Sequence, residues 1–453
     1  MVARSRRLPE FLLVLGFAAL ARAELVTETP LVSRVLPNGF EVIVYPDSSV
    51  PLVTINFVVR QGSQFETAAD NGLAHLNEHM FWRSNRGHEQ QADYLKDIGT
   101  KGITYNGSTH EEYSESYVTA LKEDLPVALR FIRDAALYPT YDPGEVAGEA
   151  NVVIGELDRL VSNANRRFNL RGIELLFPSN PAAKKPQGRH EVIARATAAQ
   201  MHTMHDHFCV PENCALIVAG DCDPAMVFKL VGELFGEWRP GTQNLTVPDF
   251  GPGLTKSVAD FFFVPDTGPV SVQLSWRGPS AATDTGATYA ADTLDHILNQ
   301  PGSRFQRALV DSGLALSVYS SYYTQRNVGP IAFTLNCEPA KARQAVKVLQ
   351  DELQQLAASD YFTDEELANA KTSLAANDLY DREKPTEYAH SIAFWWATTG
   401  TPYLLGQQQA IRGTTRADIV RYVQRYILGR PYAAVALVPE DKAWVTREDL
   451  LTP

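Results

Sequence analysis

Cysteine is scarce in this chain, with only four among 453 residues. Four thiols are too few for a disulfide scaffold, and none has the C-x-x-C spacing of a thiolate zinc site. Cys214 and Cys222 flank an apolar run that, as a strand, would hold them roughly 25 Å apart, so we expect no bond between them. These two cysteines and the other two, Cys209 and Cys337, are expected to be buried or incidentally bridged.

Excess positive charge and long apolar runs are also lacking. The formal net charge is −12, and no block of like charge is long enough to attract a phosphate backbone, which excludes nucleic acid as a partner. Glycine and proline, at 29 and 27 residues, are at ordinary levels, which excludes collagen-like and low-complexity chains. After residue 23 no stretch resembles a membrane span, so no stable membrane insertion is expected.

The N-terminal residues have the pattern of an export signal. Three arginines within the first seven residues precede an apolar run over 11–20, and residues 21–23 form an A-x-A cleavage site. The run is too short to span a bilayer as an anchor. We predict that residues 1–23 are a signal peptide and that the mature chain is exported. The periplasm fits best, although A-x-A sites also serve other exporters.

The remaining sequence predicts a mixed, α+β fold. Strand-like runs alternate with longer helical patterns and are separated by turn residues such as Pro37-Asn38-Gly39. The strands are expected near residues 31–46 (a hairpin), 52–60, 104–109, 113–120 and 214–220, and the helices near 72–82, 123–138 and 143–161. Strands and helices in this order are typical of helices packed on a mixed or antiparallel sheet.

The second half of the chain repeats the first. Residues 54–81 align without a gap on residues 271–298 at an offset of 217, which places His79 on His296. Residues 239–256 are rich in Pro, Gly, Asn and Thr and predict a linker. We therefore predict two homologous α+β domains, 24–238 and 257–453, that face each other like a clamshell across a cleft.

A histidine motif provides the sharpest functional signal. In His75-Leu76-Asn77-Glu78-His79, a helix would place the two imidazoles on one face with Glu78 beside them. Two histidines and a carboxylate suit a divalent metal, zinc above all, with Glu78 as the general base. H-x-x-E-H is the inverse of the commoner zinc-protease motif. The alternative is that the motif arises by chance from surface histidines that bind no metal.

Two observations argue against chance. A catalytic zinc needs a third ligand, and the helical pattern over 144–161 carries three glutamates, of which Glu149 and Glu156 are two turns apart and share a face. The aligned positions of the second half hold Asp292, Asp295 and His296, as if one copy had kept a metal site and the other had lost it. No matched acid completes a site in the second half.

With these residues the chain resembles the pitrilysin (insulinase) family of zinc metallopeptidases, in the two-domain branch that includes mitochondrial processing peptidase. The family motif is H-x-x-E-H, 76 residues and a glutamate, and the residue that follows the 76 residues after His79 is Glu156. The resemblance implies one zinc per chain on His75, His79 and Glu156, with Glu149 orienting a ligand. Asn106, Gly107, Ser108 and Thr109 resemble the family's N-A-x-T strand, with glycine in place of alanine, on which substrate is laid as an added strand.

One segment departs from the family pattern. Members carry an arginine and a tyrosine in the second domain that hold the substrate, and here both positions are leucine, Leu309 and Leu316. Arg307 or Tyr319 could substitute. The alternative is division of labour, in which this chain supplies zinc and a homologous subunit supplies the arginine and tyrosine.

These features predict a zinc endopeptidase that cleaves peptides or unfolded segments in an enclosed chamber, as the catalytic subunit of a heterodimer. A self-sufficient homodimeric peptidase and a non-catalytic assembly subunit are the alternatives. The histidines of MHTMHDHF, which are His202, His205 and His207, lack a spaced acid and predict a packed or solvated helix rather than a second metal site.

Overall fold

The computed structural model describes residues 30–241, 245–247, 249–264, 268–439 and 442–451. The predicted signal peptide lies outside the described residues, and so do four residues of the predicted linker. No helix in the described part of the chain is both long enough and apolar enough to cross a membrane.

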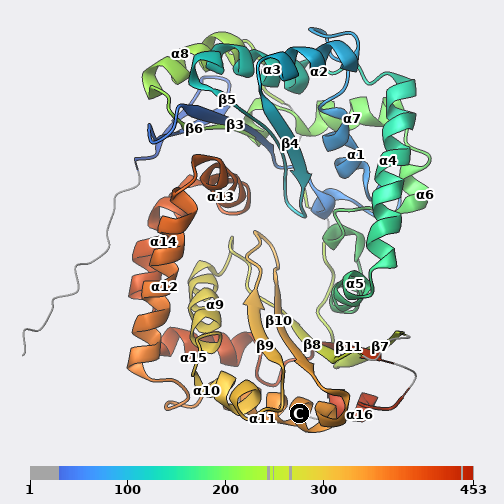
Figure 1. The fold of residues 1–453 in the computed structure, drawn as a ribbon, viewed down its shortest axis with the longest axis vertical. Coiled ribbons are helices and arrows are strands. Elements are labelled where there is room, and N and C mark those ends of the chain that lie inside the picture. Colours follow the sequence, from blue (N-terminus) through green and yellow to red (C-terminus); the bar gives the residue numbers. More distant parts are fainter. Residues whose placement is uncertain (1–29, 242–244, 248, 265–267, 440–441, 452–453) are drawn as a thin grey trace, which may run out of the picture.

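Two mixed sheets form the framework of the molecule, one from each half of the chain (Figure 1). In spatial order, the first sheet consists of β1 (Val32–Val35), β2 (Glu41–Pro46), β6 (Cys214–Gly220), β3 (Leu52–Val59), β5 (Ser114–Leu121) and β4 (Thr104–Thr109). The second consists of β7 (Val258–Val264), β11 (Ala433–Pro439), β8 (Val270–Arg277), β10 (Pro330–Cys337) and β9 (Ser317–Tyr322). The fold class predicted from the sequence is confirmed.

The helices follow the same repeat. In the first half they are α1 (Leu73–Met80), α2 (Gln91–Thr100), α3 (Leu125–Leu137), α4 (Pro143–Ser162), α5 (Ala164–Leu176), α6 (His190–Ile193), α7 (Ala198–Phe208) and α8 (Pro224–Phe235). In the second half they are α9 (Thr285–Leu298), α10 (Arg304–Gln306), α11 (Ala342–Gln355), α12 (Asp364–Arg382), α13 (Pro385–Thr398), α14 (Thr401–Gly413), α15 (Arg416–Tyr426) and α16 (Arg447–Leu451).

Both sheets have the same topology apart from β1. In each, one pair of strands is parallel, β2 with β6 and β7 with β11, and the remaining pairs are antiparallel. The offset of 217 persists well beyond the aligned segment, since α3 begins at Leu125 and α11 at Ala342. By the same correspondence α1 matches α9, β4 matches β9, α4 matches α12 and α5 matches α13.

The equivalent helices α5 and α13 each cross to the other half, which the sequence did not predict. Figure 1 shows α13 under the first sheet and α5 above the second. On α13, Ile392 and Trp396 pack in one buried cluster with Ile43 and Ile217 of the first sheet. On α5, Phe168 packs with Val435 and Leu437 of β11. Each sheet therefore has one face covered by a helix from the opposite half.

Polar contacts reinforce this exchange. The indole nitrogen of Trp396 donates to Glu41 at 2.8 Å, and the guanidinium of Arg60 donates to the carbonyl of Trp396 at 3.0 Å. That guanidinium also lies 3.8 Å from the centre of the Trp396 ring. The two halves are thus tied together by a buried aromatic side chain whose polar groups are satisfied across the junction.

Candidate metal centre

The start of α1, the helix that carries the histidine motif, is held in place by the glycine before it and by a buried carboxylate. Gly72, just before α1, has a φ of 106° and, as a glycine, has no side chain that could cap the helix. The buried carboxylate of Glu66 replaces that cap, because it accepts hydrogen bonds from the backbone nitrogens of Gly72 at 2.9 Å and Ala74 at 2.8 Å. Burial raises the pKa of Glu66 to about 7. This cap holds the first turn of α1, and with it His75.

His75, His79 and Glu156 converge. The Nε2 atoms of both histidines lie 3.6 Å from the same carboxylate oxygen of Glu156, which α4 brings over α1. One ligand atom from each of the three residues lies within 4.8 Å of the others. Tetrahedral zinc with bonds of about 2.05 Å separates its ligand atoms by about 3.3 Å, so each distance from a histidine Nε2 to the Glu156 oxygen is within a few tenths of an ångström of that value. The donor set fits zinc with one position open.

The opposite edges of both imidazoles face hydrogen-bond acceptors. Nδ1 of His79 lies 3.1 Å from Glu149, and Nδ1 of His75 lies 3.4 Å from the carbonyl of Gln187. Arg83 in turn donates to the second oxygen of Glu149. A proton held on Nδ1 leaves the lone pair on Nε2, which points at Glu156. Burial and the neighbouring His79 lower the pKa of His75, which favours the neutral form that binds metal.

Two glycines allow Gln187 to reach His75. Gly188 has a φ of 89°, and a Cβ added there would lie 2.3 Å from the Cα of Gly72. A Cβ on Gly72 would in turn lie 2.8 Å from the Cα of Gly188. No other residue fits at either position without displacing backbone. The loop that contains Gln187 is therefore locked against the start of α1.

Glu78 projects from α1 toward β4. Its carboxylate lies 3.5 Å from the hydroxyl of Thr109, and burial raises its pKa to about 7. A Cβ on Gly107 would lie 2.4 Å from Oε1 of Glu78. The glycine that replaces alanine in the N-G-S-T segment thus lets the carboxylate of Glu78 lie close against β4.

The strand β4 lies at the edge of its sheet. Within the described part of the sheet it pairs only with β5, and Asn106 is exposed. Behind it Ser108 donates to the buried Glu115 at 3.0 Å, and His390 of α13 lies 3.0 Å from the same oxygen. An edge with free backbone groups can accept a peptide as a further strand. The arrangement leaves that edge free next to Glu78.

The two leucines of the second half occupy very different environments. Leu309 lies in a short π-helical segment, Arg307–Asp311, and is completely buried in the core of the second half. Leu316 is 58% exposed. Arg307 donates to the carbonyl of Gly302, and Tyr319 is exposed on β9. The side chain of Leu309 therefore cannot reach a peptide at all.

The other sequence candidates are placed as follows. All four cysteines are free thiols, with Cys222 half-buried and the others buried. In the described residues, His75, His79 and Glu156 are the one group of three that could hold a metal ion. His205 lies 2.8 Å from the carbonyl of Ala136 and is part of the packed helix α7.

Sequence reasoning missed four residues around the site. These are Glu66, Arg83, Gln187 and His390, which cap α1, anchor Glu149, orient His75 and brace Glu115. Arg83 alone had a local signal, because it follows His79 by four residues. The others reach the site from loops or from the opposite half.

A helix with two histidines, an adjacent carboxylate and a third ligand from a crossing helix defines the metallopeptidase class of site. The chain matches the family model described as insulinase (peptidase family M16) over residues 42–172, and the model described as the peptidase M16 inactive domain over residues 195–374. The chain belongs to peptidase family M16, as the resemblance implied.

Curated relatives are similar to this chain in sequence, and solved structures are similar to it in fold. The uncharacterized zinc protease Rv2782c of Mycobacterium tuberculosis is 25% identical, over 89% of this chain and 92% of that protein. The uncharacterized zinc protease YmxG of Bacillus subtilis is also 25% identical, over 76% and 83%. A protease from Helicobacter pylori has a TM-score of 0.79 at 20% identity, covering 90% of this chain and 99% of that one. A putative M16-like peptidase from Alicyclobacillus acidocaldarius has a TM-score of 0.80 at 16% identity, covering 91% and 100%.

Proposed function

We propose that the chain is a zinc-dependent endopeptidase that acts on peptides or unfolded segments in an enclosed chamber. The convergence of both Nε2 atoms on one oxygen of Glu156 carries the proposal. An assembly subunit has no need of two oriented imidazoles, each with an acceptor at Nδ1. The family names of the relatives support a zinc protease.

Each residue has a distinct role in this proposal. His75, His79 and Glu156 hold the metal, and Glu149 fixes the orientation of His79. Zinc bound there would act as a Lewis acid toward the scissile carbonyl and the attacking water. Glu78 takes the proton of that water and later passes it to the leaving amine. A carboxyl whose pKa is raised toward neutrality suits both transfers, and β4 positions the peptide beside it.

We further propose that a homologous subunit completes the site. Leu309 is part of the core and the side chain of Leu316 cannot form a hydrogen bond, so neither side chain can hold a substrate carboxyl end. A partner that carries the arginine and tyrosine would supply these contacts. The N-terminal sequence supports export, and we propose the periplasm as the location.

The Glu78→Gln variant tests the peptidase proposal. We expect it to keep its zinc, because Glu78 is outside the converging set, and to lose roughly 100- to 10,000-fold in hydrolysis rate, because an amide cannot accept the proton. Zinc content and peptide hydrolysis are measured on the same preparation, with the homologous subunit present. A variant that arrives without metal, or hydrolyses at the wild-type rate, overturns the assignment.

A further inference from the structure

One turn of the second half is bound by the first half. Residues 323–329 join β9 to β10, and Figure 1 shows this hairpin pointing toward the first half. The carboxylate of Glu112 accepts hydrogen bonds from the backbone nitrogens of Arg326 at 2.8 Å and Asn327 at 3.4 Å. The side-chain amide of Asn327 donates to Gln64 at 3.0 Å. The first half therefore holds both the backbone and a side chain of this β9–β10 turn.

A buried lysine of the first half is bound to the same turn. Lys184 ends the short 3-10 helix Ala182–Lys184, and its ammonium donates to the side chain of Gln325 and, at 2.7 Å, to the carbonyl of Val328. The centre of the Phe250 ring lies 4.4 Å from the same ammonium. Among the described residues, both oxygens that accept from Lys184 thus belong to the second half.

These two acceptors fix the position of the ammonium. Burial lowers the pKa of Lys184, and the negative charge of Glu112 opposes that effect. A buried ammonium that loses an acceptor is costly, so it moves toward water or toward another acceptor. Lys184 therefore makes the conformation of its own segment depend on the β9–β10 turn.

The segment 182–188, which contains Lys184, also reaches the metal centre. Three residues after Lys184, the carbonyl of Gln187 lies 3.4 Å from Nδ1 of His75. Between them, the carbonyl of Lys185 accepts a hydrogen bond at 3.0 Å from the side chain of Asn71, two residues before α1. A displacement at Lys184 would therefore be passed to the carbonyl that orients His75 and to the start of its helix.

We infer that Lys184 is a positioning residue, which makes the orientation of His75, and so the zinc affinity of the first half, depend on the β9–β10 turn of the second. The inference rests on the proposed zinc site and needs no assumption about peptide hydrolysis. It gives the second half, which has no group of three metal ligands in its described part, a role in holding the metal. Because such coupling is reciprocal, bound zinc should in turn stabilise the contact with the turn.

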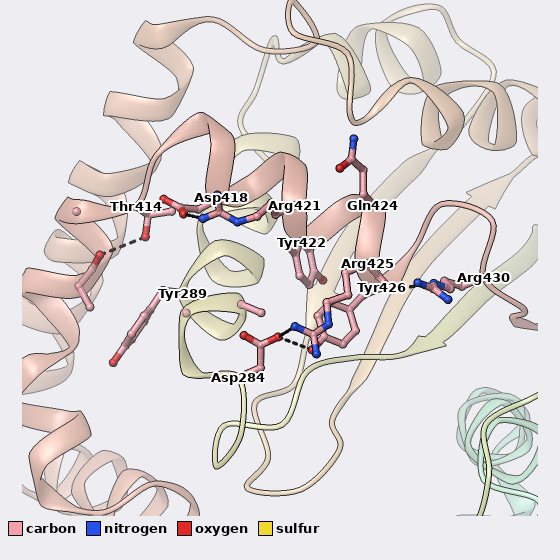
Figure 2. Close-up of a pocket in the computed structure, with 14 residues that line it drawn as sticks. Asp284, Tyr289, Thr414, Asp418, Arg421, Tyr422, Gln424, Arg425, Tyr426 and Arg430 are labelled. Carbon is pink, nitrogen blue, oxygen red and sulfur yellow. Dashed lines mark hydrogen bonds and ion pairs between the residues drawn. The ribbon is translucent and has the colours of Figure 1, made fainter.

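Two contacts of the second half provide matched controls. The hydroxyl of Thr401 on α14 donates to Glu41 on β2 at 2.7 Å, so Thr401→Val removes a hydrogen bond between the halves away from the segment 182–188. Figure 2 shows a cavity of about 540 Å³ that is lined only by residues of the second half. There Arg425 binds Asp284 at 2.8 Å, so Arg425→Met removes a charged contact within that half.

The first test compares zinc affinities, measured by competition with a chelator, in full-length variants of equal melting temperature. Gln325→Met removes one acceptor of Lys184 and should weaken zinc binding roughly 3- to 10-fold, less than the 10- to 100-fold typical of a residue that bonds directly to a ligand. Gln325→Glu keeps an acceptor oxygen and should retain wild-type affinity, as should Thr401→Val and Arg425→Met. Unchanged affinity in Gln325→Met, or an equal loss in Thr401→Val, overturns the inference.

A double substitution tests whether the effect passes through Lys184. Lys184→Met removes the ammonium, so Gln325→Met has no partner left to disturb. The double variant should therefore bind zinc as Lys184→Met alone does. Independent, additive losses in the two single variants would overturn the role of Lys184.

Hydrogen exchange of the wild-type chain, with and without zinc, needs no variant. The amides of Arg326 and Asn327 bond to Glu112, so their exchange reports the contact between the halves. Zinc should slow exchange in residues 182–189 and, by a similar factor, at these two amides. Zinc that binds but slows only residues 182–189 overturns the inference and leaves the zinc site.

The remaining outcomes separate the inference from the proposed function. A response to zinc at both places without any peptide hydrolysis, with the homologous subunit present, supports the inference and overturns the peptidase. A wild-type chain that binds no zinc overturns both.

Discussion

The two halves of this chain share one topology and differ in the side chains at one place. In the first half, α1 and α4 bring two imidazoles and a carboxylate together. In the second half, the equivalent helices α9 and α12 border a cavity with two carboxyls and aromatic walls. The comparison teaches that the fold supplies a pocket between helix and edge strand, and that four or five side chains decide its chemistry.

The orienting residues differ as much as the ligands. His79 has Glu149 at its Nδ1 atom, and Glu149 has Arg83, so the imidazole is held from behind. His296 has no hydrogen bond or ion pair within the described residues, and burial lowers its pKa. The second half therefore differs from the first in the residues that support a metal site as well as in the ligands.

The largest expected effect is that of removing the third ligand in one half only. Glu156→Gln should release the zinc and lower peptide hydrolysis by more than about 100-fold, since changes outside the ligand shell already cost 10- to 100-fold. Ser373→Ala, on the equivalent helix α12, should change neither. Equal metal loss in both variants would break the comparison. Elemental analysis and hydrolysis rates measure the two effects.

A second prediction concerns the crossing helices. Trp396→Ala should lower the free energy of unfolding by about 3–5 kcal/mol, because a completely buried indole is lost from the first sheet. Both halves should still unfold in one transition, because α5 and α13 join them. Phe263→Ala, at an exposed aromatic residue of β7, is the control and should be nearly neutral. Chemical denaturation followed by circular dichroism would contradict the account if two separate transitions appeared.

A smaller effect on zinc affinity is expected when the carboxylate that orients His79 is replaced. Glu149→Gln should weaken zinc affinity about 10- to 100-fold, since the amide binds the Nδ1 proton less strongly than a carboxylate does. Glu145→Gln lies one turn earlier on α4 and bonds to Ser84 instead, so it should retain wild-type affinity. Competition with a chelator measures both. Unchanged affinity in Glu149→Gln would remove Glu149 from the site.

The smallest effect is expected at Gly107. A methyl group there would overlap the carboxylate of Glu78, which can swing aside, so Gly107→Ala should lower kcat/KM by roughly 10-fold or less. Zinc content should not change, and Gly99→Ala, which meets open space, is the matched control. A loss of metal in Gly107→Ala would show that β4 affects the ligands rather than Glu78.

Much of the site followed from spacing along the sequence. The helical positions of His75, Glu78 and His79 follow from 3.6 residues per turn, and the repeat located the second, altered copy. The family spacing singled out Glu156, and the structure brings it to both histidines. Local periodicity carries such information because it fixes which side chains share a face.

The crossing of α5 and α13 could not be predicted in this way. An apolar helix face indicates that the helix packs against another element, but it does not indicate which of two similar sheets that element is. The same limit applies to Gln187 and His390, which reach the site across long sequence separations. Leu309 is completely buried, so Leu309→Arg would force a charge into the core. The hypothesis that a partner subunit supplies the missing tyrosine is therefore better tested with Leu316→Tyr, at an exposed position.

Zinc stoichiometry in a matched pair of variants tests the central claim most directly. The wild-type chain should bind one zinc, His79→Ala should bind none, and His296→Ala, at the equivalent position of the second half, should still bind one. Calorimetric titration of the metal-free chain, checked by elemental analysis, gives these numbers. Two zinc ions in the wild type, or metal loss in His296→Ala, would contradict the assignment of the metal centre to the first half alone.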